Sequence, residues 1–410
     1  MYALIDCNNF YASCEQVFNP NYREKPLVIL SSNDGCIIAR SKEAKKLGIP
    51  MGAPAYEHKT LFLKNDVITL SSNFALYGDM SHRVIETIKT FNLPIEIYSI
   101  DEVFLVIPEK DQIELGKLIR EKVLQWTGIT VSIGIAPTKT LAKIANHSAK
   151  KGKGVVKYTS SLLQDLPVDQ IWGIGKHLKK RLHSHSIRYA HQLIQMSDHW
   201  IKKHLTVVGL RTVMELRETP CIGLLEIPPE RKSIVSSRSF GRAVITLKEL
   251  KEAIATFVAN AARKLRREHL KAHFLLIFIS ANRFKSETAT IHLPIATAYT
   301  PDLIKAAHAL LEGIYQNGFS YKKGGVMLSE LISENESQLD LFSKEKNGLK
   351  KRQVIETVDQ INARFSKQIM TFAGEGIQKK WKSLSSMRSP NYTTCWEEIP
   401  SVKNNGKSSE

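Results

Sequence analysis

Two adjacent carboxylates interrupt an otherwise apolar stretch of the sequence. Asp101 and Glu102 lie within residues 96–107, where β-branched and aromatic side chains predict a buried strand. Burying an unpaired carboxylate is costly, so the pair must either lie in a solvated hairpin tip or face cations. The first alternative needs no function. The second predicts a divalent metal site, because Mg²⁺ prefers hard oxygen ligands and keeps waters and substrate phosphates in its coordination shell.

A third carboxylate stands near the beginning of the chain. Residues 2–5 are apolar and predict a short strand that ends at Asp6. A carboxylate at a strand end is a common ligand position in α/β proteins. If the two strands are neighbours, Asp6, Asp101 and Glu102 converge. Because successive strand residues point to opposite faces, Asp101 and Glu102 can share one site only where the backbone turns or the longer Glu102 side chain reaches round.

Basic and aromatic residues accompany these acids. Lys42 and Lys45 are three residues apart in a predicted short helix and so lie one turn apart on its surface. Lys150 follows a second predicted helix, and Tyr11 comes five residues after Asp6. Each has an ordinary interpretation, because most lysines are solvated and an aromatic residue after a strand usually belongs to a core.

Three motifs in a fixed order carry a family resemblance. They are Asp-Cys-Asn-Asn-Phe-Tyr at 6–11, Ser-Ile-Asp-Glu at 99–102 and Ile-Ala-Pro-Thr-Lys-Thr-Leu-Ala-Lys-Ile-Ala-Asn at 135–146. With them the sequence resembles the Y-family translesion DNA polymerases over nearly its whole length, and within that family the UmuC group. Together the motifs are far more specific than any one of them.

The resemblance implies template-directed nucleotidyl transfer from a dNTP to a primer 3′-hydroxyl. Asp6, Asp101 and Glu102 would be the catalytic carboxylates and would hold two Mg²⁺ ions, with the backbone carbonyl of Cys7 as a further ligand. The implied activity is error-prone synthesis past damaged bases in the SOS response.

The resemblance also implies a nucleotide site. Lys45 and Lys150 would hold the triphosphate, where compact ammonium groups neutralise phosphate charge. Lys42, at a position where many relatives carry an aromatic residue, is assigned to the same site. Tyr11 would be the steric gate that excludes a ribose 2′-hydroxyl, and Phe10 would back its ring or contact the sugar and base.

Composition and charge agree with a nucleic-acid partner. The chain has 410 residues, of which 43% are hydrophobic and 24% charged, enough for two to four globular domains. A formal net charge of +18 indicates a polyanionic partner, and primer-template DNA fits better than a membrane because no polybasic amphipathic helix adjoins a lipidation motif. Without a signal peptide or a long apolar run, we expect a cytoplasmic protein. Five scattered cysteines without a C-x-x-C pair predict neither disulfides nor zinc.

The predicted fold class is α/β and α+β in several domains. Strand and helix patterns alternate to about residue 165, and the resemblance supplies the arrangement of a right-hand polymerase. The expected units are palm and fingers at 1–165, a helix-hairpin-helix thumb at 166–230, a little finger at 231–335, a clamp-binding linker at 336–345 and a partner-binding C-terminal region at 346–410.

Two segments are candidates for DNA contact. Gly173 and Gly175 precede a predicted helix that begins near Lys176, where backbone N–H groups could grip a DNA phosphate without reading sequence, although G-x-G also serves ordinary turns. Arg263 and Arg266 end a predicted helix in the little finger. They would contact the DNA backbone or belong to a solvated helix face.

The C-terminal part of the chain contains candidate protein-binding segments. An apolar L-x-L-F pattern in a polar setting resembles the pentapeptide that binds the β sliding clamp. Its residues are Gln338, Leu339, Asp340, Leu341 and Phe342. The tail after it has aromatic residues in a polar context. The resemblance implies that it docks a processed UmuD-type dimer, and that the protein meets a RecA filament; the alternative is a small appended domain.

Two other functions remain open for this sequence. One is a different metal-dependent enzyme on a palm fold, such as a nuclease or a nucleotidyl cyclase, against which Tyr11, the helix-hairpin-helix and the clamp segment argue. The other is a catalytically weak DNA-binding scaffold of a repair complex. A scaffold predicts a missing carboxylate, yet all three are present.

Overall fold

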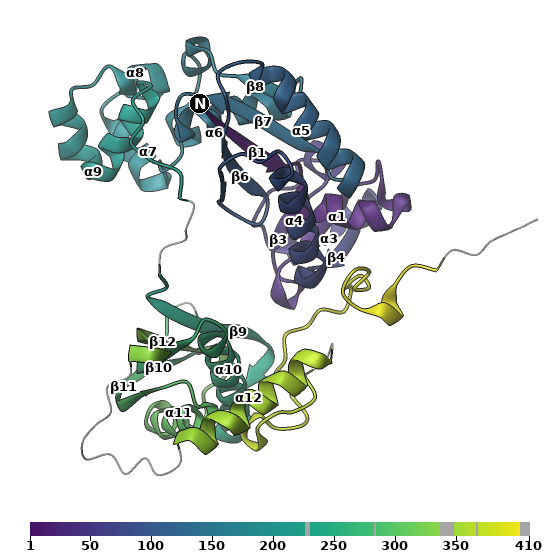
Figure 1. The fold of residues 1–410 in the computed structure, drawn as a ribbon. Helices are drawn as coiled ribbons and strands as arrows, with labels where there is room; N and C mark the ends of the chain where they lie inside the picture. Colours follow the sequence, from purple (N-terminus) through teal and green to yellow (C-terminus); the bar gives the residue numbers. More distant parts are fainter. Residues whose placement is uncertain (226–229, 283, 337–347, 366–367, 402–410) are drawn as a thin grey trace, which may run out of the picture.

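The chain forms two lobes that are joined by the chain itself, by the C-terminal tail and by a direct contact of Asn33 with Phe240. The computed structural model describes residues 1–401 apart from 226–229, 283, 337–347 and 366–367. One lobe contains the units expected to be palm, fingers and thumb, and the other the unit expected to be the little finger; these names are kept below. The C-terminal tail runs from the second lobe back to the first (Figure 1). Among the described helices, none combines the length and apolarity that a bilayer crossing requires.

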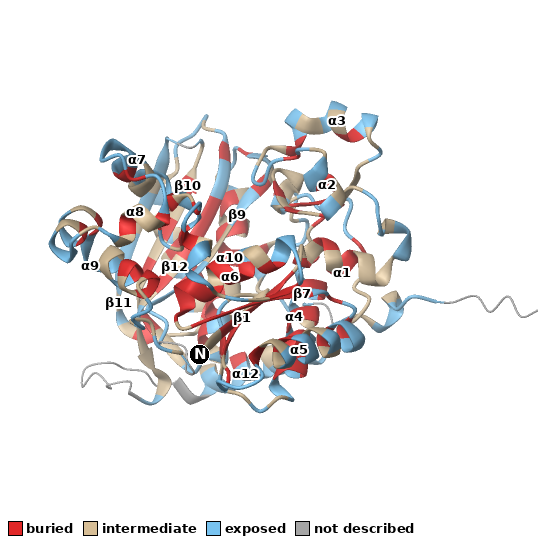
Figure 2. Cartoon of the chain, turned by 90° about the horizontal axis from the view of Figure 1, so that it is seen from above, coloured by how far each residue is buried: buried red, intermediate tan, exposed pale blue. Residues whose placement is uncertain are grey.

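The palm is a five-stranded sheet with its first strand in the middle. The strand order is β5-β6-β1-β7-β8, and β1 is antiparallel to both of its neighbours. Figure 2 shows β1 and β7 as buried, which agrees with their apolar composition. The strands are β1 (Tyr2–Cys7), β5 (Ile95–Ile97), β6 (Glu102–Val106), β7 (Val131–Ala136) and β8 (Val155–Lys157).

Alternate strand residues of the palm enter two different cores. Ala3 and Ile5 face the helices α1, α4 and α5, whereas Leu4 faces α6 and the thumb. This alternation is the period of two that a strand imposes on side chains. The helices are α1 (Phe10–Phe18), α4 (Phe74–Lys89), α5 (Gln112–Thr127) and α6 (Lys139–Lys151).

The stretch predicted as one strand over 96–107 is two strands with a turn between them. The backbone N–H groups of Tyr98 and Ser99 both donate to the carbonyl of Glu102 at 3.1 Å, which closes the turn from β5 to β6. Asp101 lies in this turn and Glu102 is the first residue of β6. The backbone therefore turns where the two carboxylates stand.

The fingers are a small sheet with short helices. The strand order is β3-β2-β4, and the sheet packs on its own apolar cluster. As predicted, a short helix follows Ser41, whose Oγ accepts from Ala44 N at 3.2 Å. The elements are β2 (Leu27–Leu30), β3 (Ile37–Arg40), α2 (Lys42–Lys46), α3 (Lys59–Lys64) and β4 (Ile68–Ser71).

The thumb is helical and shares a core with α6. Its helices are α7 (Lys176–Ser184), α8 (Ala190–Ile194) and α9 (Asp198–Leu216). Buried Glu215 ties the end of α9 to the palm, because its carboxylate accepts from Thr140 N at 2.9 Å and from Cys221 N at 3.0 Å. These bonds satisfy a carboxylate that is otherwise removed from water.

The little finger is an antiparallel sheet covered on one face by two helices. The strand order is β11-β10-β12-β9, and α10 and α11 share its core. Strand β9, for which the sequence predicted no element, is an edge strand that pairs with β12, and its buried apolar residues Ile234, Phe240 and Val244 are widely spaced. The elements are β9 (Ser233–Val244), α10 (Leu247–Arg267), β10 (Leu270–Ser280), β11 (Ser286–Thr297), α11 (Thr300–Ile314) and β12 (Tyr321–Ser333).

The C-terminal region begins on the little finger. Its helix α12 (Gly348–Arg364) is held by Asp359, whose carboxylate receives two bonds from Arg266 at 2.6 and 3.0 Å. Most of the described residues after α12 have no regular secondary structure. Trp381 is buried against Phe240 and Phe257, and the chain then runs to the fingers and palm.

Candidate active site

The three predicted carboxylates lie at neighbouring strand ends. In the antiparallel pair of β1 and β6, Asp6 stands directly opposite Glu102. Asp101 precedes β6, and its carbonyl accepts from Cys7 N at 2.9 Å. The condition set by the sequence is met, because the turn before Glu102 removes the strict alternation that would send Asp101 to the other face.

Each carboxylate has its own partner. Lys150 Nζ lies 2.6 Å from Asp6 Oδ2, Lys143 Nζ lies 2.8 and 2.9 Å from the two Glu102 oxygens, and Ser99 Oγ donates to Asp101 Oδ1 at 2.6 Å. Within the part of the chain that the structure describes, no three His, Cys, Asp or Glu residues form a group that could hold a metal ion. Asp6 and Glu102 thus each face an ammonium group, whereas Asp101 is held by a neutral hydroxyl.

Neighbouring charged groups at this edge of the sheet shift the pKa of Asp6 in opposite directions. The pKa of Asp6 is raised to about 6, because burial and the neighbouring charges of Glu102 and Asp101 raise it by more than Lys150 lowers it. Carboxylate oxygens are the kind of donor that a hard divalent cation such as Mg²⁺ prefers, but as described the three acids are paired with their own partners and do not form a metal-binding group. Burial, aided by Asp6, also raises the pKa of the Cys7 thiol, which stays protonated and is a poor ligand.

Two of the three predicted phosphate-binding lysines lie beside the carboxylates. The Lys45 ammonium donates to Asn9 Oδ1, and the pKa of Lys45 is lowered by burial, Arg40 and Lys150, so Lys45 and Lys150 share one electrostatic environment. Lys42 is exposed at the first position of α2. The arrangement places two ammonium groups next to the acids, where a triphosphate could bind.

Tyr11 stands half-buried beside the same site. Its ring stacks on Tyr77 with centroids 4.5 Å apart and planes 15° apart, and the Phe74 ring lies nearly perpendicular to it with centroids 5.9 Å apart. Burial and the charge of Asp101 raise the pKa of Tyr11, which therefore stays protonated. Phe10 is buried in the palm core with its ring centroid 5.8 Å from that of Tyr11.

Comparison with known proteins decides the family. Residues 5–147 match the impB/mucB/samB family, residues 231–341 match the C-terminal domain of that family, and residues 352–402 match a domain of unknown function, DUF4113. Protein UmuC of Salmonella typhimurium is 40% identical over 422 residues, which cover 98% of this chain and 100% of that protein. The chain belongs to the impB/mucB/samB family.

Other relatives and solved structures agree with this family. Protein MucB of Escherichia coli is 37% identical over 98% of this chain and 99% of its own, and DNA polymerase IV of Bacillus anthracis is 28% identical over 92% of this chain and 94% of its own. A Dbh–Dpo4 chimera of a Y-family DNA polymerase has a TM-score of 0.68 at 23% identity and covers 81% of this chain and 99% of its own. The predicted Y-family fold, the UmuC-type membership and the enzyme class, a DNA polymerase, are confirmed.

Sequence reasoning missed Lys143 as a site residue of this family member. Besides binding Glu102, its ammonium lies 4.5 Å from the Tyr98 ring centroid and 5.4 Å from that of Trp172 in the thumb. Lys143 and Lys150 are seven residues apart on α6 and so share one face of the helix, a spacing visible in the sequence.

A buried ion pair behind the site was also missed. Lys139 pairs with Glu96, and their side chains are 1% and 8% exposed. Lys139 Nζ also donates to the carbonyl of Gly223 at 2.7 Å, while Leu225 N donates to Glu96 Oε2 at 2.6 Å. The pair joins β5 and α6 to the segment that follows the thumb.

The predicted turn at the start of the thumb is present. Gly173 has a positive φ of 89° and Gly175 is the N-cap of α7, so Lys176 is the first helical residue. The turn is therefore of the predicted kind, with backbone N–H groups at a helix N-terminus. Phosphate binding by this turn stays a prediction.

The arginines predicted to contact DNA are engaged within the second lobe. Besides its bonds to Asp359, Arg266 Nη1 donates to the Ala298 carbonyl at 2.8 Å, and Arg263 Nη2 donates to Asn260 Oδ1 at 2.9 Å. Arg266 thus anchors α12, and DNA contact by either arginine stays a prediction. The predicted clamp-binding segment 338–342 lies outside the described residues.

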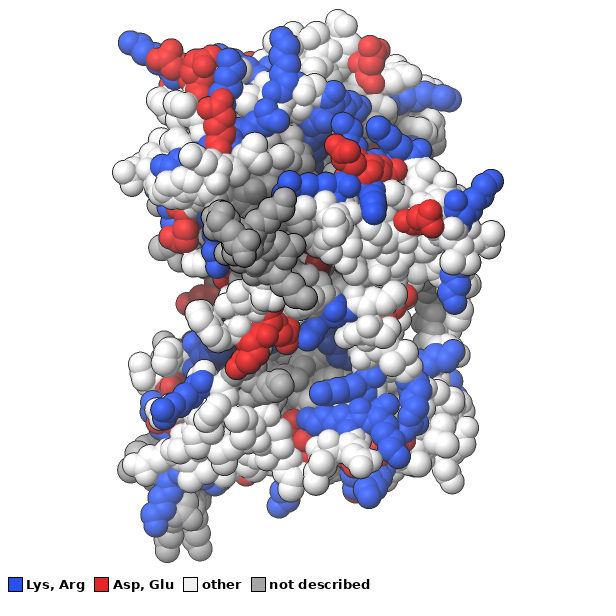
Figure 3. Space-filling view, turned by 90° about the vertical axis from the view of Figure 1, so that its right-hand side faces the viewer, with Lys and Arg blue, Asp and Glu red and all other residues white. Residues whose placement is uncertain are grey.

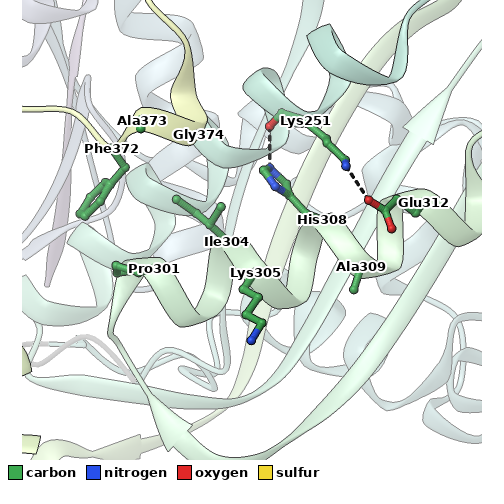
Figure 4. A pocket seen from close by; sticks show the side chains of 10 residues that line it. All are labelled: Lys251, Pro301, Ile304, Lys305, His308, Ala309, Glu312, Phe372, Ala373 and Gly374. Atoms are coloured by element: carbon green, nitrogen blue, oxygen red, sulfur yellow. Dashed lines mark hydrogen bonds and ion pairs between the residues drawn. The ribbon is translucent and has the colours of Figure 1, made fainter. Parts of the chain in front are cut away.

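The molecular surface shows a hollow that is separate from the carboxylates. It has a volume of about 600 Å³ and is lined by α10, α11 and residues 372–374 (Figure 4). On its wall Lys251 pairs with Glu312, and His308 Nε2 donates to the Lys251 carbonyl at 3.0 Å. Because it belongs to the little finger and the tail, it is distinct from the candidate nucleotide site.

Basic side chains are unevenly spread over the surface. On the face shown in Figure 3, Lys and Arg side chains gather near the top and near the lower right, whereas Asp and Glu are more scattered. Such basic groups, together with the net charge of +18, favour a polyanionic ligand.

Proposed function

We propose that this chain is an error-prone, template-directed DNA polymerase that carries out translesion synthesis in the SOS response. The observation that carries the proposal is the register of β1 and β6, which places Asp6 opposite Glu102 with Asp101 in the adjoining turn. The lysines and the aromatic gate stand beside this acidic edge. Phosphoryl transfer needs such positioned charges more than covalent chemistry.

The carboxylates of Asp6, Asp101 and Glu102, with the backbone carbonyl of Cys7, would hold two Mg²⁺ ions. When bound, the ions supply activation of the primer 3′-hydroxyl and neutralise charge on the leaving pyrophosphate. Lys150 now binds Asp6, and its ammonium is 2.6 Å from Oδ2. A triphosphate offers Lys150 and Lys45 phosphate oxygens as alternative partners, so both lysines bind and orient the nucleotide.

Tyr11 acts on the sugar of that nucleotide. Its ring is fixed between stacking on Tyr77 and edge contact with Phe74. A ring held in this way occupies the volume that a 2′-hydroxyl requires, so ribonucleotides are excluded by overlap rather than by a polar contact.

DNA and protein partners follow from the other units. The thumb turn at Gly173–Lys176 and the basic surface bind the primer-template backbone. Residues 338–342 bind the β sliding clamp, and the C-terminal region docks a processed UmuD-type dimer and meets the RecA filament. These assignments rest on the resemblance to the UmuC group and on the relatives named UmuC and MucB.

The test is primer extension by the purified full-length chain with Mg²⁺ and dNTPs, with and without clamp and UmuD-type partner. We expect extension that is lost in Asp101→Ala and Glu102→Ala and kept in the control Glu109→Ala, which removes an exposed acid just beyond β6. Tyr11→Ala should raise ribonucleotide incorporation. If the chain binds DNA tightly but extends no primer in any of these combinations, the polymerase assignment is wrong and the DNA-binding scaffold is the better one.

A further inference from the structure

The C-terminal tail reaches the palm behind the candidate gate. Residues 381–392, here called the tail strap, leave the little finger where Gly241 N donates to the Trp381 carbonyl at 3.0 Å. They pass the fingers, where Ser71 N donates to the Met387 carbonyl at 3.0 Å. They end on α1, where the Tyr392 ring stacks on Phe18 with centroids 4.9 Å apart. The strap is thus held at both lobes.

The strap contributes one buried hydroxyl to the palm. Ser389 Oγ donates to Glu15 Oε1 at 2.9 Å, and Tyr77 Oη donates to the same oxygen at 2.7 Å. Ser389 is 8% exposed and Glu15 fully buried. Asn73, the N-cap of α4, holds this point of the strap by donating to the carbonyls of Ser389 at 3.1 Å and Pro390 at 3.0 Å.

Glu15 depends on these two hydroxyl donors. Its second oxygen, Oε2, is buried and has no hydrogen-bond partner among the described residues. Burial raises the pKa of Glu15, whereas the bonds from Tyr77 and Ser389 lower it. Loss of the Ser389 hydroxyl leaves the buried carboxyl with Tyr77 as its one hydroxyl donor, so the position of Tyr77 must readjust to that carboxyl.

The same Tyr77 ring is the stacking partner of Tyr11. Glu15 and Tyr11 are one turn apart on α1, and Tyr77 touches both, through its hydroxyl and through its ring. The contacts form a continuous path from Ser389 through Glu15 and Tyr77 to Tyr11. Every element of the path except Tyr11 is buried, so little room exists for independent movement.

We propose that Ser389 is a positioning residue for sugar selection, which acts through Glu15 and Tyr77 on the ring of Tyr11. The inference rests on the proposed function and extends it: the C-terminal tail sets how strictly the polymerase excludes ribonucleotides. The tail therefore serves nucleotide choice as well as partner binding.

The experiment measures kcat/KM for a dNTP and for the matching rNTP on one primer-template with the full-length chain. In Ser389→Ala we expect the preference for the dNTP to fall about fivefold, the size typical of one lost hydrogen bond. Tyr77→Phe keeps the ring but loses the hydroxyl, and it should also lower the preference for the dNTP. In the double variant Ser389→Ala/Tyr77→Phe, the loss of preference should differ from the sum of the two single losses. Ser389→Thr keeps the hydroxyl and should restore the preference.

The matched control lies on the same strap. Ser383 Oγ donates to the Ser239 carbonyl at 2.9 Å in the little finger, so Ser383→Ala removes a strap hydroxyl without touching Glu15. We expect an unchanged preference in this variant. An equal loss in Ser383→Ala and Ser389→Ala would overturn the proposal, because general loosening of the strap would then explain both.

Two outcomes separate this proposal from the proposed function. An unchanged preference in Ser389→Ala and Tyr77→Phe, or an equal fall of kcat/KM for both nucleotides, overturns the role of Ser389. If the parent still extends the primer, the proposed polymerase function stands. A parent chain that extends with neither nucleotide overturns both.

Discussion

The palm and the little finger use their charged residues differently. In the palm, Lys139 and Glu96 are almost completely buried, and Lys150 and Lys143 cover carboxylates at the sheet edge. In the little finger, Lys251 and Glu312 pair with side chains that are 31% and 56% exposed. A buried charge that loses its partner destabilises the fold strongly, whereas an exposed charge that loses its partner is solvated by water at little cost. Loss of the buried palm pair should therefore be costly, whereas loss of the exposed Lys251–Glu312 pair should change stability little.

Removing one member of the buried pair should have the largest effect on stability. Lys139→Met leaves Glu96 unpaired in the core, and we expect the free energy of unfolding to fall by about 3 to 5 kcal/mol. Urea denaturation followed by circular dichroism measures this. The double variant Lys139→Met/Glu96→Leu should recover much of the loss, and a double variant as unstable as the single one would contradict the electrostatic cause.

Asp6→Asn should separate activity from stability. We expect primer extension to fall by about a thousandfold, because a ligand for the proposed metal ions is lost. The metal-free variant should nevertheless be more stable than the parent at pH 7.5, by up to about 3 kcal/mol, because burial raises the pKa of Asp6 from 3.8 to about 6 and the ionised form therefore opposes folding. Thermal melts in EDTA check the sign, and a destabilised variant would contradict it.

The same pKa predicts how this difference depends on pH. A carboxyl whose folded pKa lies above its unfolded pKa contributes stability below the unfolded value, and this stability is lost as the pH rises through the folded value. The stability difference between Asp6→Asn and the parent should therefore be largest above about pH 6 and should shrink to zero as the pH falls towards 3.8. Melting temperatures between pH 7.5 and 4 in EDTA test this, with Glu109→Gln as the control that should show no such trend.

The smallest effect is expected in the little finger. Lys251→Met removes the exposed pair with Glu312 and should leave the melting temperature unchanged within measurement error, at low and at high salt. A loss of stability as large as that of Lys139→Met would show that the exposed pair matters as much as the buried one, which contradicts the difference drawn between the two regions.

The sequence predicted the parts of the fold that local patterns encode. Palm strands and helices follow from apolar runs and helical spacing, and the acids were noticeable because Asp101 and Glu102 interrupt such a run. The sequence left the turn between β5 and β6 open beside a continuous strand, because Tyr98 and Ile100 are typical strand residues. Strand β9 was missed because it is a polar edge strand.

The remaining features depend on contacts between distant residues. Asn73 binds Ser389 across 316 positions, and Arg266 binds Asp359 across 93. Local sequence patterns do not predict hydrogen bonds between residues so far apart. The sequence therefore indicated partner binding for the tail and DNA contact for the arginine, but not these contacts within the chain. Lys143 stood within a recognised motif, but its proximity to Glu102 depends on how α6 lies across the sheet.

The tail strap changes how the two lobes can move. They are connected by the chain between α9 and β9 and by the strap contacts on Ser71, Asn73 and Phe18. Asn33 of the fingers also holds β9 directly, because its amide donates to the carbonyls of Ser239 at 3.2 Å and Phe240 at 2.9 Å. A rigid body attached at one point can rotate in every direction, whereas each further contact away from that point removes directions of rotation. The strap therefore restricts how the little finger rotates relative to the palm, and its detachment would leave the Asn33 contact as a direct constraint between the two lobes.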